Sequence, residues 1–513
     1  MAQRQSFRHR HVSKFKHVFG NPAKKEGCYE GINISQIAWE SNFCAVNPKF
    51  LAVALESSCG GPFLVLPLSQ TGKIDPFNQP KVNGHTRPVL DLGWNPFDDN
   101  VIASASEDCS IKIWYIPDCG LCEDLNREDF IGHLQGHDRK VGIIRWHPCA
   151  SNIIASAGFD DVIIIWDVER EAAVLILKGH PDTIFSLSFN WNGSLIATTC
   201  KDKKIRVIDP REGRLIASGE GHKGPKCSQV VFLGNTSRLF STGFSRTQER
   251  EVAVWDLGNA LKRPLNIEQL DSSSGNIMLY YDHDTHMVYL AGKGDGNIRY
   301  YEVLEEEPYF MFLNEFRSAS PQRGLGVMPK RGLEVHKCEI MRFYKLQNNG
   351  VVEPIAMTVP RRHSGTYQFD LFPKTPSNKP AMSAEQWIMG SNKAPLMDEL
   401  LPGLTVDGMS REAYESSKRE DETKQKENKT GSKFTRSQDS IGAYHNESEH
   451  SMVNGTKAKA KHDYKNWDLE TLRIAFADLQ EEVFALKTQL KAKDARILQL
   501  EKEHKYYSEK FGF

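Results

Sequence analysis

Few residues of this chain have the types and spacing that catalysis or metal binding requires. The run His283-Asp284-Thr285-His286 places two imidazoles and a carboxylate together, a combination that could bind a metal ion. It precedes a strand predicted for Met287–Ala291, and no further ligands follow nearby. Ordinary polar residues at a turn are therefore the favoured interpretation, and we expect no metal site.

Two other motifs are equally weak as sites. Gly292-x-Gly294-x-Gly296 opens a strand and is not followed by a helix, so it predicts a hairpin turn and not a nucleotide-binding loop. Cys119 and Cys122 form a single C-x-x-C pair among ten cysteines, which indicates free thiols in a reducing compartment. The sequence thus predicts a protein that is not an enzyme and has no catalytic residues, metal or cofactor.

Seven strand-like segments recur along the first two thirds of the chain, and most close on an aromatic or bulky residue. They are Pro62–Leu68, Ser110–Ile116, Val162–Val168, Lys204–Pro210, Glu251–Leu257, Asn297–Val303 and Glu339–Leu346. The residues at the tryptophan position of these segments, spaced by 42 to 52 residues, are Leu66, Trp114, Trp166, Ile208, Trp255, Tyr301 and Phe343. This is the repeat length of a propeller blade, so the pattern predicts an all-β seven-bladed WD-repeat propeller.

Gly-His pairs run in phase with these segments, about 30 residues before the tryptophan position. They are Gly84-His85, Gly136-His137, Gly179-His180 and Gly221-His222. An acid recurs about six residues before the tryptophan position, at a tight turn, as Asp108, Asp160, Asp202, Glu249 and Asp295. We expect a buried hydrogen-bond chain of His, Ser or Thr, Asp and Trp, with members that include His85, Asp108, Trp114, His137, Asp160 and Trp166.

The charge balance and the hydropathy of the sequence argue against two classes of protein, nucleic-acid binders and membrane-spanning proteins. The 65 basic and 66 acidic residues nearly cancel, which argues against a bulk nucleic-acid binder. No run approaches the roughly 20 apolar residues needed to cross a bilayer, and the first residues lack the apolar stretch of a signal peptide. We therefore expect a cytoplasmic protein with no nucleic-acid partner and no membrane span.

Changes in composition divide the chain into four parts. Residues 1–350 carry the blades, and one terminus must donate a strand to the blade begun at the other so that the ring closes without exposed edges. Residues 351–409 form a C-terminal extension that is expected to pack on one face of the ring, because it contains Tyr367, Phe369, Phe372 and Trp387. Residues 410–466 have few large apolar side chains, which predicts a disordered linker.

Residues 467–510 show a heptad repeat that does not slip over six heptads. Its a positions are Leu469, Phe476, Val483, Leu490, Ile497 and His504, and its d positions are Leu472, Leu479, Leu486, Lys493, Leu500 and Tyr507. This regularity predicts an α-helical coiled coil, and the pairing of Glu482 with Lys487 suits parallel strands in register. The alternative is an amphipathic helix docked on the propeller, which would have a wider apolar face.

Several runs of sequence beyond the blade pattern point to one family. They are Ser13-Lys-Phe-Lys-His-Val-Phe-Gly20, Phe43-Cys-Ala-Val-Asn-Pro48, Gly292-Lys-Gly-Asp-Gly-Asn-Ile-Arg-Tyr-Tyr301, Pro321-Gln-Arg-Gly324, Met328-Pro-Lys-Arg-Gly-Leu333 and Met357-Thr-Val-Pro-Arg361. In these runs the chain resembles the coronins, including the type II branch with a longer coil. The resemblance covers the propeller, the extension and the coiled coil, and it leaves only the linker unmatched.

The resemblance implies a function that the blades alone do not. Coronins bind filamentous actin and tune its turnover, with the branch-nucleating actin-related-protein complex and the severing factor cofilin as partners. The same roles, and a place at the actin cytoskeleton, are therefore expected here. Coronins often carry a basic residue shortly after a Cys-Tyr pair, whereas in this chain Cys28-Tyr29 is followed by the neutral Asn33.

The coil contains a run similar to the family's trimerisation motif. In that motif the arginine bridges to the glutamate across strands while two apolar residues fill the core, roles that fall here on Arg496, Glu501, Ile497 and Leu500. The motif favours a homotrimer. The core residues by themselves leave a homodimer open, since Leu, Phe, Val and Ile all occur at a.

Filamentous actin is acidic, so a binder should offer lysine and arginine on one side. The candidate actin-binding residues are Lys14, Lys16, Lys24, Lys25, Arg87, Arg139, Lys140, Lys203 and Lys204, and Lys201 and Arg206 lie beside the last two. The alternative function is a WD-repeat scaffold for a non-actin signalling or nuclear repressor complex, since propellers host many roles on one fold.

Overall fold

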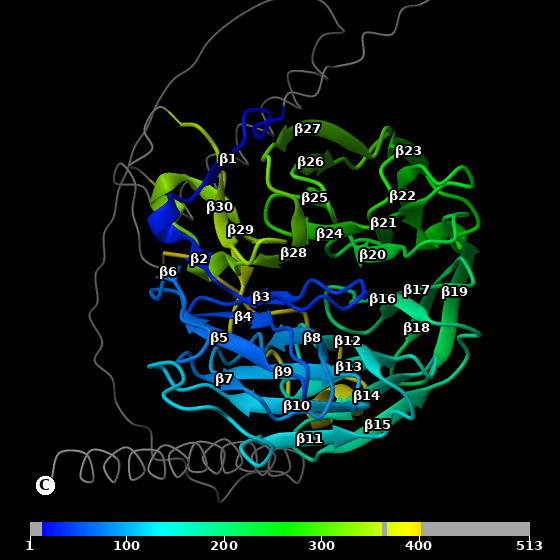
Figure 1. Cartoon of the computed structure of the whole chain (residues 1–513). Coiled ribbons are helices and arrows are strands. Elements are labelled where there is room, and N and C mark those ends of the chain that lie inside the picture. Colours follow the sequence, from blue (N-terminus) through cyan, green and yellow to red (C-terminus); the bar gives the residue numbers. More distant parts are fainter. Residues whose placement is uncertain (1–12, 362–366, 402–513) are drawn as a thin grey trace, which may run out of the picture. The chain divides into compact units, whose positions relative to one another are not determined.

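Antiparallel sheets repeat around a central axis in the computed structural model, which describes residues 13–361 and 367–401 (Figure 1). Blade 1 consists of β3 (Cys44–Val46), β4 (Phe50–Ala54), β5 (Phe63–Pro67) and β7 (Lys81–Val82). Blade 2 consists of β8 (Val89–Trp94), β9 (Val101–Ser106), β10 (Ser110–Tyr115) and β11 (Gly132–Gln135). Blade 3 consists of β12 (Val141–Trp146), β13 (Ile153–Gly158), β14 (Ile163–Asp167) and β15 (Ala172–Leu177).

The next three blades follow the same order from the inner to the outer strand. Blade 4 consists of β16 (Ile184–Phe189), β17 (Ile196–Cys200), β18 (Lys204–Asp209) and β19 (Arg214–Glu220). Blade 5 consists of β20 (Gln229–Phe232), β21 (Arg238–Phe244), β22 (Arg250–Asp256) and β23 (Asn266–Asp271). Blade 6 consists of β24 (Ile277–Asp282), β25 (Met287–Gly292), β26 (Ile298–Val303) and β27 (Phe310–Phe316). Blade 7 consists of β28 (Gln322–Val327), β29 (Glu339–Gln347), β30 (Val352–Thr358) and β1 (Phe19–Pro22), and the predicted seven-bladed propeller is confirmed.

Short elements connect the blades and the extension. They are η1 (Lys25–Gly27), β2 (Tyr29–Glu30), β6 (Gly72–Lys73), η2 (Leu257–Asn259), η3 (Lys330–Gly332), η4 (Val335–Lys337), β31 (Thr375–Pro376), α1 (Ala384–Ile388) and β32 (Met397–Asp398).

Burial explains why the inner strands read as nearly continuous apolar runs. Each blade packs between two others, so both faces of β13 and β14 are covered and every one of their residues is buried. The outermost strands have one open edge, and β15 and β19 accordingly bury only one residue each. The apolar runs therefore mark the inner part of each blade.

The ring closes through the N-terminal strand. β1 pairs antiparallel with β30, with Phe19 opposite Thr358 and Pro22 opposite Ile355. The hydroxyl of Tyr300 in blade 6 donates a hydrogen bond to the carbonyl of Val18 at 2.6 Å, which fixes the start of this strand. Closure by a donated terminal strand is what the repeat pattern predicts.

Blade 7 differs from the prediction in one respect. The seventh predicted segment, Glu339–Leu346, lies in β29, which is the second strand of its blade and not the third, as in blades 1 to 6. Its Phe343 pairs with Ile355 of β30, and β30 is the third strand. The spacing of the predicted segments along the chain cannot reveal this order, because the fourth strand of blade 7, β1, comes from the N-terminal end of the propeller and does not follow β30 in the sequence. The blade thus extends to Thr358, past the predicted boundary at residue 350.

The two ends of the blades form two distinct faces. In an antiparallel sheet the turn between the second and third strands lies at the same end as the connection to the next blade. That end carries the four Gly-His pairs, and we call it the His face. The opposite end carries the turns between the first and second strands, and we call it the extension face because residues 367–401 contact it.

The extension is held by its aromatic residues. Trp387 is fully buried, its ring packs edge-on against His147 at 5.0 Å, and its indole N–H donates to the carbonyl of Gly193 at 3.2 Å. The guanidinium of Arg211 lies over the indole at 5.7 Å. Ser383 caps α1 through a capping box with Gln386. These contacts attach the extension to blades 3 and 4.

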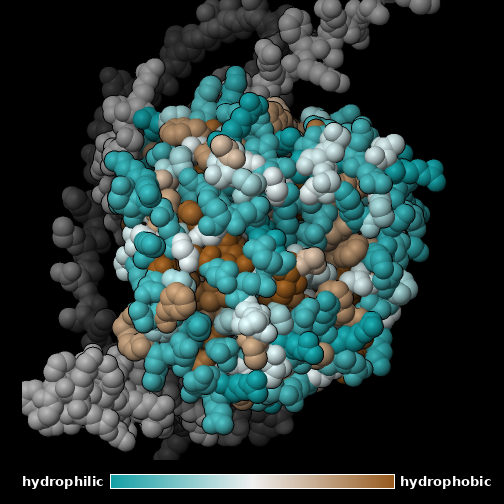
Figure 2. All heavy atoms as spheres, in the orientation of Figure 1, coloured by the Kyte–Doolittle hydropathy of each residue, from teal (hydrophilic) through white to brown (hydrophobic). Residues whose placement is uncertain are grey.

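A second irregular segment crosses the His face. Residues 35–43, which we call the strap, precede β3 and run across the centre of the ring in Figure 1. The indole N–H of Trp39 donates to the carbonyl of Gly142 in blade 3, and the ammonium of Lys293 in blade 6 donates to the carbonyls of Trp39 and Ser41. Arg323 in blade 7 donates to two further strap carbonyls. In Figure 2 hydrophobic side chains gather near this centre, and hydrophilic ones cover the rim.

The predicted linker, residues 410–466, and the predicted coiled coil, residues 467–510, lie outside the described residues.

Replacing Trp387 with alanine should lower the free energy of unfolding by about 3–5 kcal/mol, because the change leaves a cavity beneath the extension. Urea unfolding measures this loss. The matched control is Met389→Ala, two residues further on, whose side chain is 84% exposed and should be neutral. Equal stabilities for the two variants would show that the extension does not depend on this contact.

Candidate functional site

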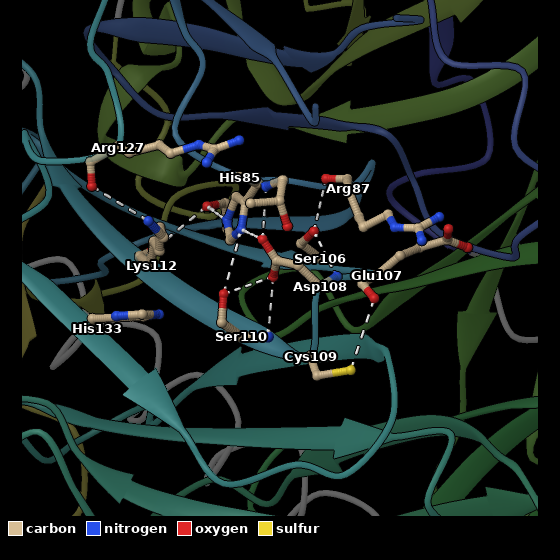
Figure 3. A network of polar contacts seen from close by, with 12 residues as sticks. His85, Arg87, Ser106, Glu107, Asp108, Cys109, Ser110, Lys112, Arg127 and His133 are labelled. Carbon is tan, nitrogen blue, oxygen red and sulfur yellow. Dashed lines mark hydrogen bonds and ion pairs between the residues drawn. The ribbon is translucent and has the colours of Figure 1, made fainter. Parts of the chain in front are cut away.

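A buried hydrogen-bond network holds the loops of the His face in blade 2 (Figure 3). The Nδ1 of His85 lies 2.8 Å from Oδ2 of Asp108, and its Nε2 lies 2.7 Å from the hydroxyl of Ser104. The indole N–H of Trp114 donates to the same hydroxyl at 2.9 Å. The predicted chain of His, Ser, Asp and Trp is thus present.

The geometry of the network indicates which nitrogen of His85 carries the proton. The hydroxyl of Ser104 accepts from Trp114, so its own hydrogen is available to Nε2 of His85. Nδ1 then carries the proton and donates to the carboxylate of Asp108. Blade 3 repeats the arrangement, with distances of 2.9, 2.7 and 2.8 Å, among His137, Asp160, Ser156 and Trp166.

Blade 5 keeps the network but uses a different acid. His222 Nδ1 lies 2.8 Å from Glu251, and Ser241 joins His222 to Trp255. The prediction that Glu249 is the acid of this network is therefore wrong. The Glu249 carboxylate instead accepts hydrogen bonds from the side chains of Thr247 and Gln269. The turn of blade 5, residues 245–249, is longer than those of blades 2 and 3, so the acid that reaches the histidine is supplied by β22 itself.

Two other predicted acids bind arginine. Asp202 of blade 4 is held by Arg206, and Asp295 of blade 6 lies 2.7 Å from Arg250. The His180 network of blade 4 is thus incomplete, since its Nδ1 is buried without a hydrogen-bond partner.

The network changes the acidity of its members. Burial alone would raise the pKa of Asp108, but the hydrogen bonds from His85, Ser110 and the backbone N–H of Thr86 hold that pKa well below its usual range. Burial lowers the pKa of His137 in spite of its carboxylate partner. The Asp108 carboxylate is therefore ionised in the folded protein at neutral pH.

Five of the nine predicted actin-binding residues lie on the His face. Arg87, Arg139 and Lys140 converge on a depression of about 460 Å³ between blades 2 and 3, which Glu107 and Phe159 also line. The ammonium of Lys140 lies 3.1 Å from Glu107 and 4.4 Å from the centre of the Phe159 ring. The guanidinium of Arg87, beside Glu107 in Figure 3, has no ion-pair partner among the described residues.

Lys203 and Lys204 lie at the corresponding turn of blade 4. Both are exposed, and the ammonium of Lys204 lies 3.8 Å from Glu220 on the neighbouring strand. They therefore continue the positive surface that begins in blades 2 and 3.

The four N-terminal candidates do not join this group. Lys14 and Lys16 precede β1 at the extension-face end of blade 7, and the ammonium of Lys14 donates to the carbonyl of Asp370 in the extension. Lys24 and Lys25 lie at η1, on the outer edge of the same blade. The exposed Asn33 donates a long hydrogen bond, 3.4 Å, to the carbonyl of Glu56.

Several further cations on the His face escaped prediction, and two of them extend the positive surface into blade 5. Lys223 and Arg246 of blade 5 are exposed and have no ion-pair partner in the described part of the chain. Lys223 directly follows a Gly-His pair, a position that could have marked it. We call the whole set the basic arc, made of Arg87, Arg139, Lys140, Lys203, Lys204, Lys223 and Arg246.

The histidines that could suggest a metal are engaged otherwise. His283 packs against Trp191 at 4.8 Å and Tyr281 at 5.0 Å, and His286 Nδ1 lies 2.9 Å from the hydroxyl of Tyr281. Over residues 13–361 and 367–401, no group of three potential metal ligands occurs.

The fold and its buried networks define a WD-repeat β-propeller protein. The WD domain, G-beta repeat, model matches residues 78–115, 128–167 and 172–209, and a type of WD40 repeat matches residues 352–395. A domain of unknown function, DUF1899, matches residues 8–73. The solved WD40 domain of Toxoplasma gondii coronin superposes with a TM-score of 0.71 at 30% identity, covering 76% of this chain and 98% of that one.

Curated relatives show the family. The chain is 52% identical to human Coronin-2A over 397 residues, which cover 76% of this chain and 74% of the relative. It is 47% identical to mouse Coronin-2B over 392 residues, which cover 76% of this chain and 80% of the relative. The chain belongs to the coronin family, and these relatives agree with the type II branch. Among the described residues, no helix has the length and apolar character of a membrane span.

Replacing Asp108 with asparagine should lower the free energy of unfolding by about 2 kcal/mol at pH 7, because a charge-assisted buried hydrogen bond is weakened. The folded-state pKa lies below the ordinary value of about 3.9, so the stabilisation is complete above about pH 5 and is lost as the pH falls.

Urea unfolding between pH 7 and pH 3 tests both statements. The difference between wild type and Asp108→Asn should shrink toward low pH, while the exposed Asp138→Asn should match wild type throughout. A constant difference would contradict the assigned ionisation.

Proposed function

We propose that this chain binds filamentous actin through the basic arc and thereby regulates the organisation and turnover of the actin cytoskeleton. The observation that carries the proposal is the convergence of Arg87, Arg139 and Lys140 on one depression of the His face. Filamentous actin is acidic, and a concave basic surface attracts acidic side chains over several ångströms. Membership in the coronin family supports the same function.

The state of these side chains supports binding of an acidic surface. Arg87, Lys203, Lys223 and Arg246 are exposed and without ion-pair partners in the described residues, so binding would break no existing pair. Lys140 is already paired with Glu107, which lowers its contribution. Exposed charges are screened by salt, so the affinity should fall as ionic strength rises.

The chain acts as a binding protein in this proposal, and not as an enzyme. Its buried histidines serve structure, because His85, His137 and His222 each join a serine to an acid beneath the His face. The expected location is the cytoplasm, at the actin cytoskeleton. The actin-related-protein branching complex and cofilin are further proposed partners.

Oligomerisation is the second part of the proposal. Residues 467–510 are proposed to form a parallel coiled coil, a homotrimer by the Arg496–Glu501 motif or otherwise a homodimer. Several propellers tethered to one filament would gain about 10²-fold or more in apparent affinity without new contacts.

Arg87→Glu combined with Arg139→Glu should weaken filament binding at least tenfold at low salt, because two attractions become repulsions. Co-sedimentation of the full-length chain with filamentous actin across a salt series measures this. The matched control, Lys262→Glu with Arg263→Glu, makes the same change of charge on the extension face and should bind as wild type does.

Two other outcomes are informative. Equal loss in both double variants would indicate a general charge effect and not a site. Absence of wild-type binding even at low salt would favour a WD-repeat scaffold for a non-actin complex.

Ile497→Asp combined with Leu500→Asp should dissociate the oligomer, since each aspartate would face the predicted coil core. Sedimentation equilibrium should then report a monomer, and filament affinity should fall by about 10²-fold. The matched control, Ala495→Asp with Gln499→Asp, introduces two aspartates at the f and c positions of the predicted heptad, outside its core, and should leave both properties unchanged. A monomeric variant with full affinity would remove avidity from the mechanism.

A further inference from the structure

Blade 4 retains the histidine of the buried network but not its acid. His180 is 8% exposed, and its Nε2 lies 2.9 Å from the hydroxyl of Thr198, as in the other blades. Its Nδ1 is buried and has no hydrogen-bond partner. The matching acid, Asp202, accepts instead from both terminal nitrogens of Arg206, one of them at 3.1 Å.

The tryptophan position also differs in this blade, where it is occupied by Ile208. Ile208 has no N–H to donate to Thr198, and it is smaller than an indole. A Cβ added at Gly84 would lie 2.1 Å from the ring of Trp114, whereas one added at Gly179 would meet nothing within 4 Å. The contact between glycine and indole in blade 2 therefore has no counterpart in blade 4.

Besides the backbone N–H of Lys204 and the thiol of Cys200, the Asp202 carboxylate thus has two potential partners on its own blade, Arg206 and His180. The side chains of Arg206 and Asp202 are only 11% and 16% exposed, so the pair is shielded from water. In blades 2 and 3 the acid at the same position binds the Nδ1 of the histidine at 2.8 and 2.9 Å. The hydroxyl of Thr198 can donate to Nε2, which leaves Nδ1 of His180 as a donor.

Three lysines and two acids, Glu220 and Asp182, surround this pair. Lys203 is exposed and has no ion-pair partner in the described residues, and Lys204 and Lys201 lie 3.8 and 3.3 Å from their acidic neighbours. A carboxylate that approaches blade 4 can therefore pair with Lys203 without breaking an existing ion pair, and the guanidinium of Arg206 is the less exposed cation of the same turn.

We propose that Asp202 exchanges partners when an acidic protein surface docks on blade 4: Arg206 turns to the incoming carboxylate, and Asp202 turns to Nδ1 of His180. Withdrawing an arginine from a shielded pair would otherwise leave the aspartate unpaired, which is strongly unfavourable. His180 removes that penalty, because it would bind the acid as His85 and His137 do in blades 2 and 3. The identity of the docking surface as the actin filament rests on the proposed function.

The exchange can be tested without actin. In the full-length chain labelled with ¹⁵N-histidine, the Nδ1–H signal of His180, identified by its loss in His180→Phe, reports the bond to Asp202. Arg206→Gln frees Asp202, so the hydrogen-bonded signal should appear in this variant without any ligand and disappear again when Asp202→Asn is added. Hexaglutamate should induce the same signal in wild type. An unchanged His180 signal in Arg206→Gln would overturn the exchange.

Filament binding supplies the second test. Arg206→Gln and His180→Phe should each weaken co-sedimentation about tenfold, the first by removing the charge and the second by removing the alternative partner of Asp202. Arg206→Lys should retain most of the affinity. Wild-type affinity in His180→Phe together with a loss in Arg206→Gln would mean that Arg206 acts alone and would overturn the exchange.

These experiments distinguish a failure of the proposed actin binding from a failure of the proposed exchange at Asp202. A wild-type chain that does not sediment with filaments, but whose His180 signal responds to hexaglutamate, would refute actin as the partner and support the exchange. An equal response to inorganic phosphate at the same concentration would overturn the assignment to a carboxylate surface.

Discussion

Blade 7 is built from both ends of the propeller, because β28, β29 and β30 come last along the chain and β30 pairs with β1, which comes first. β1 supplies the outer strand of this blade and covers the edge of β30 that would otherwise be open, which joins the N-terminal end of the propeller to its last blade. The hydrogen bond from Tyr300 to Val18 ties this strand to blade 6 as well. The two irregular segments depend on closure, since the strap leaves blade 7 for β3 and the extension begins after β30.

Loops on the His face are held from below by buried polar groups. Histidine, serine and an acid each satisfy one another in blades 2, 3 and 5, so burial of these groups carries no unpaired polar atom within the network. The tryptophan completes the chain and fills the space above the preceding glycine, as Trp114 does at Gly84. This rigid support lets the turns present charged side chains outward, which is how the basic arc comes to share one face.

Blades 4, 5 and 6 depart from the pattern, and each keeps an acid near the turn although the position or the partner of that acid changes. Blade 5 supplies Glu251 from the strand because its turn is longer, and blade 6 pairs Asp295 with Arg250 of the preceding blade. In blade 4, where Ile208 stands at the tryptophan position, Asp202 binds Arg206 and the Nδ1 of His180 has no acid partner. Buried carboxylates thus find a partner in each case, but in blades 4 and 6 that partner is a guanidinium.

Repeat length, strand pattern, the His and Asp register of blades 2 and 3, and the family could all be read from the sequence, because each depends on residues within one blade or one motif. Tertiary structure alone decided which charges share a surface. Lys14 and Arg87 look equivalent as basic residues, but they lie on opposite faces, since β1 enters blade 7 from the extension side. Likewise, Trp39 reaches blade 3, and β30 and not β29 is the third strand of its blade. These outcomes follow from contacts between residues far apart in sequence, whose partners no local pattern specifies.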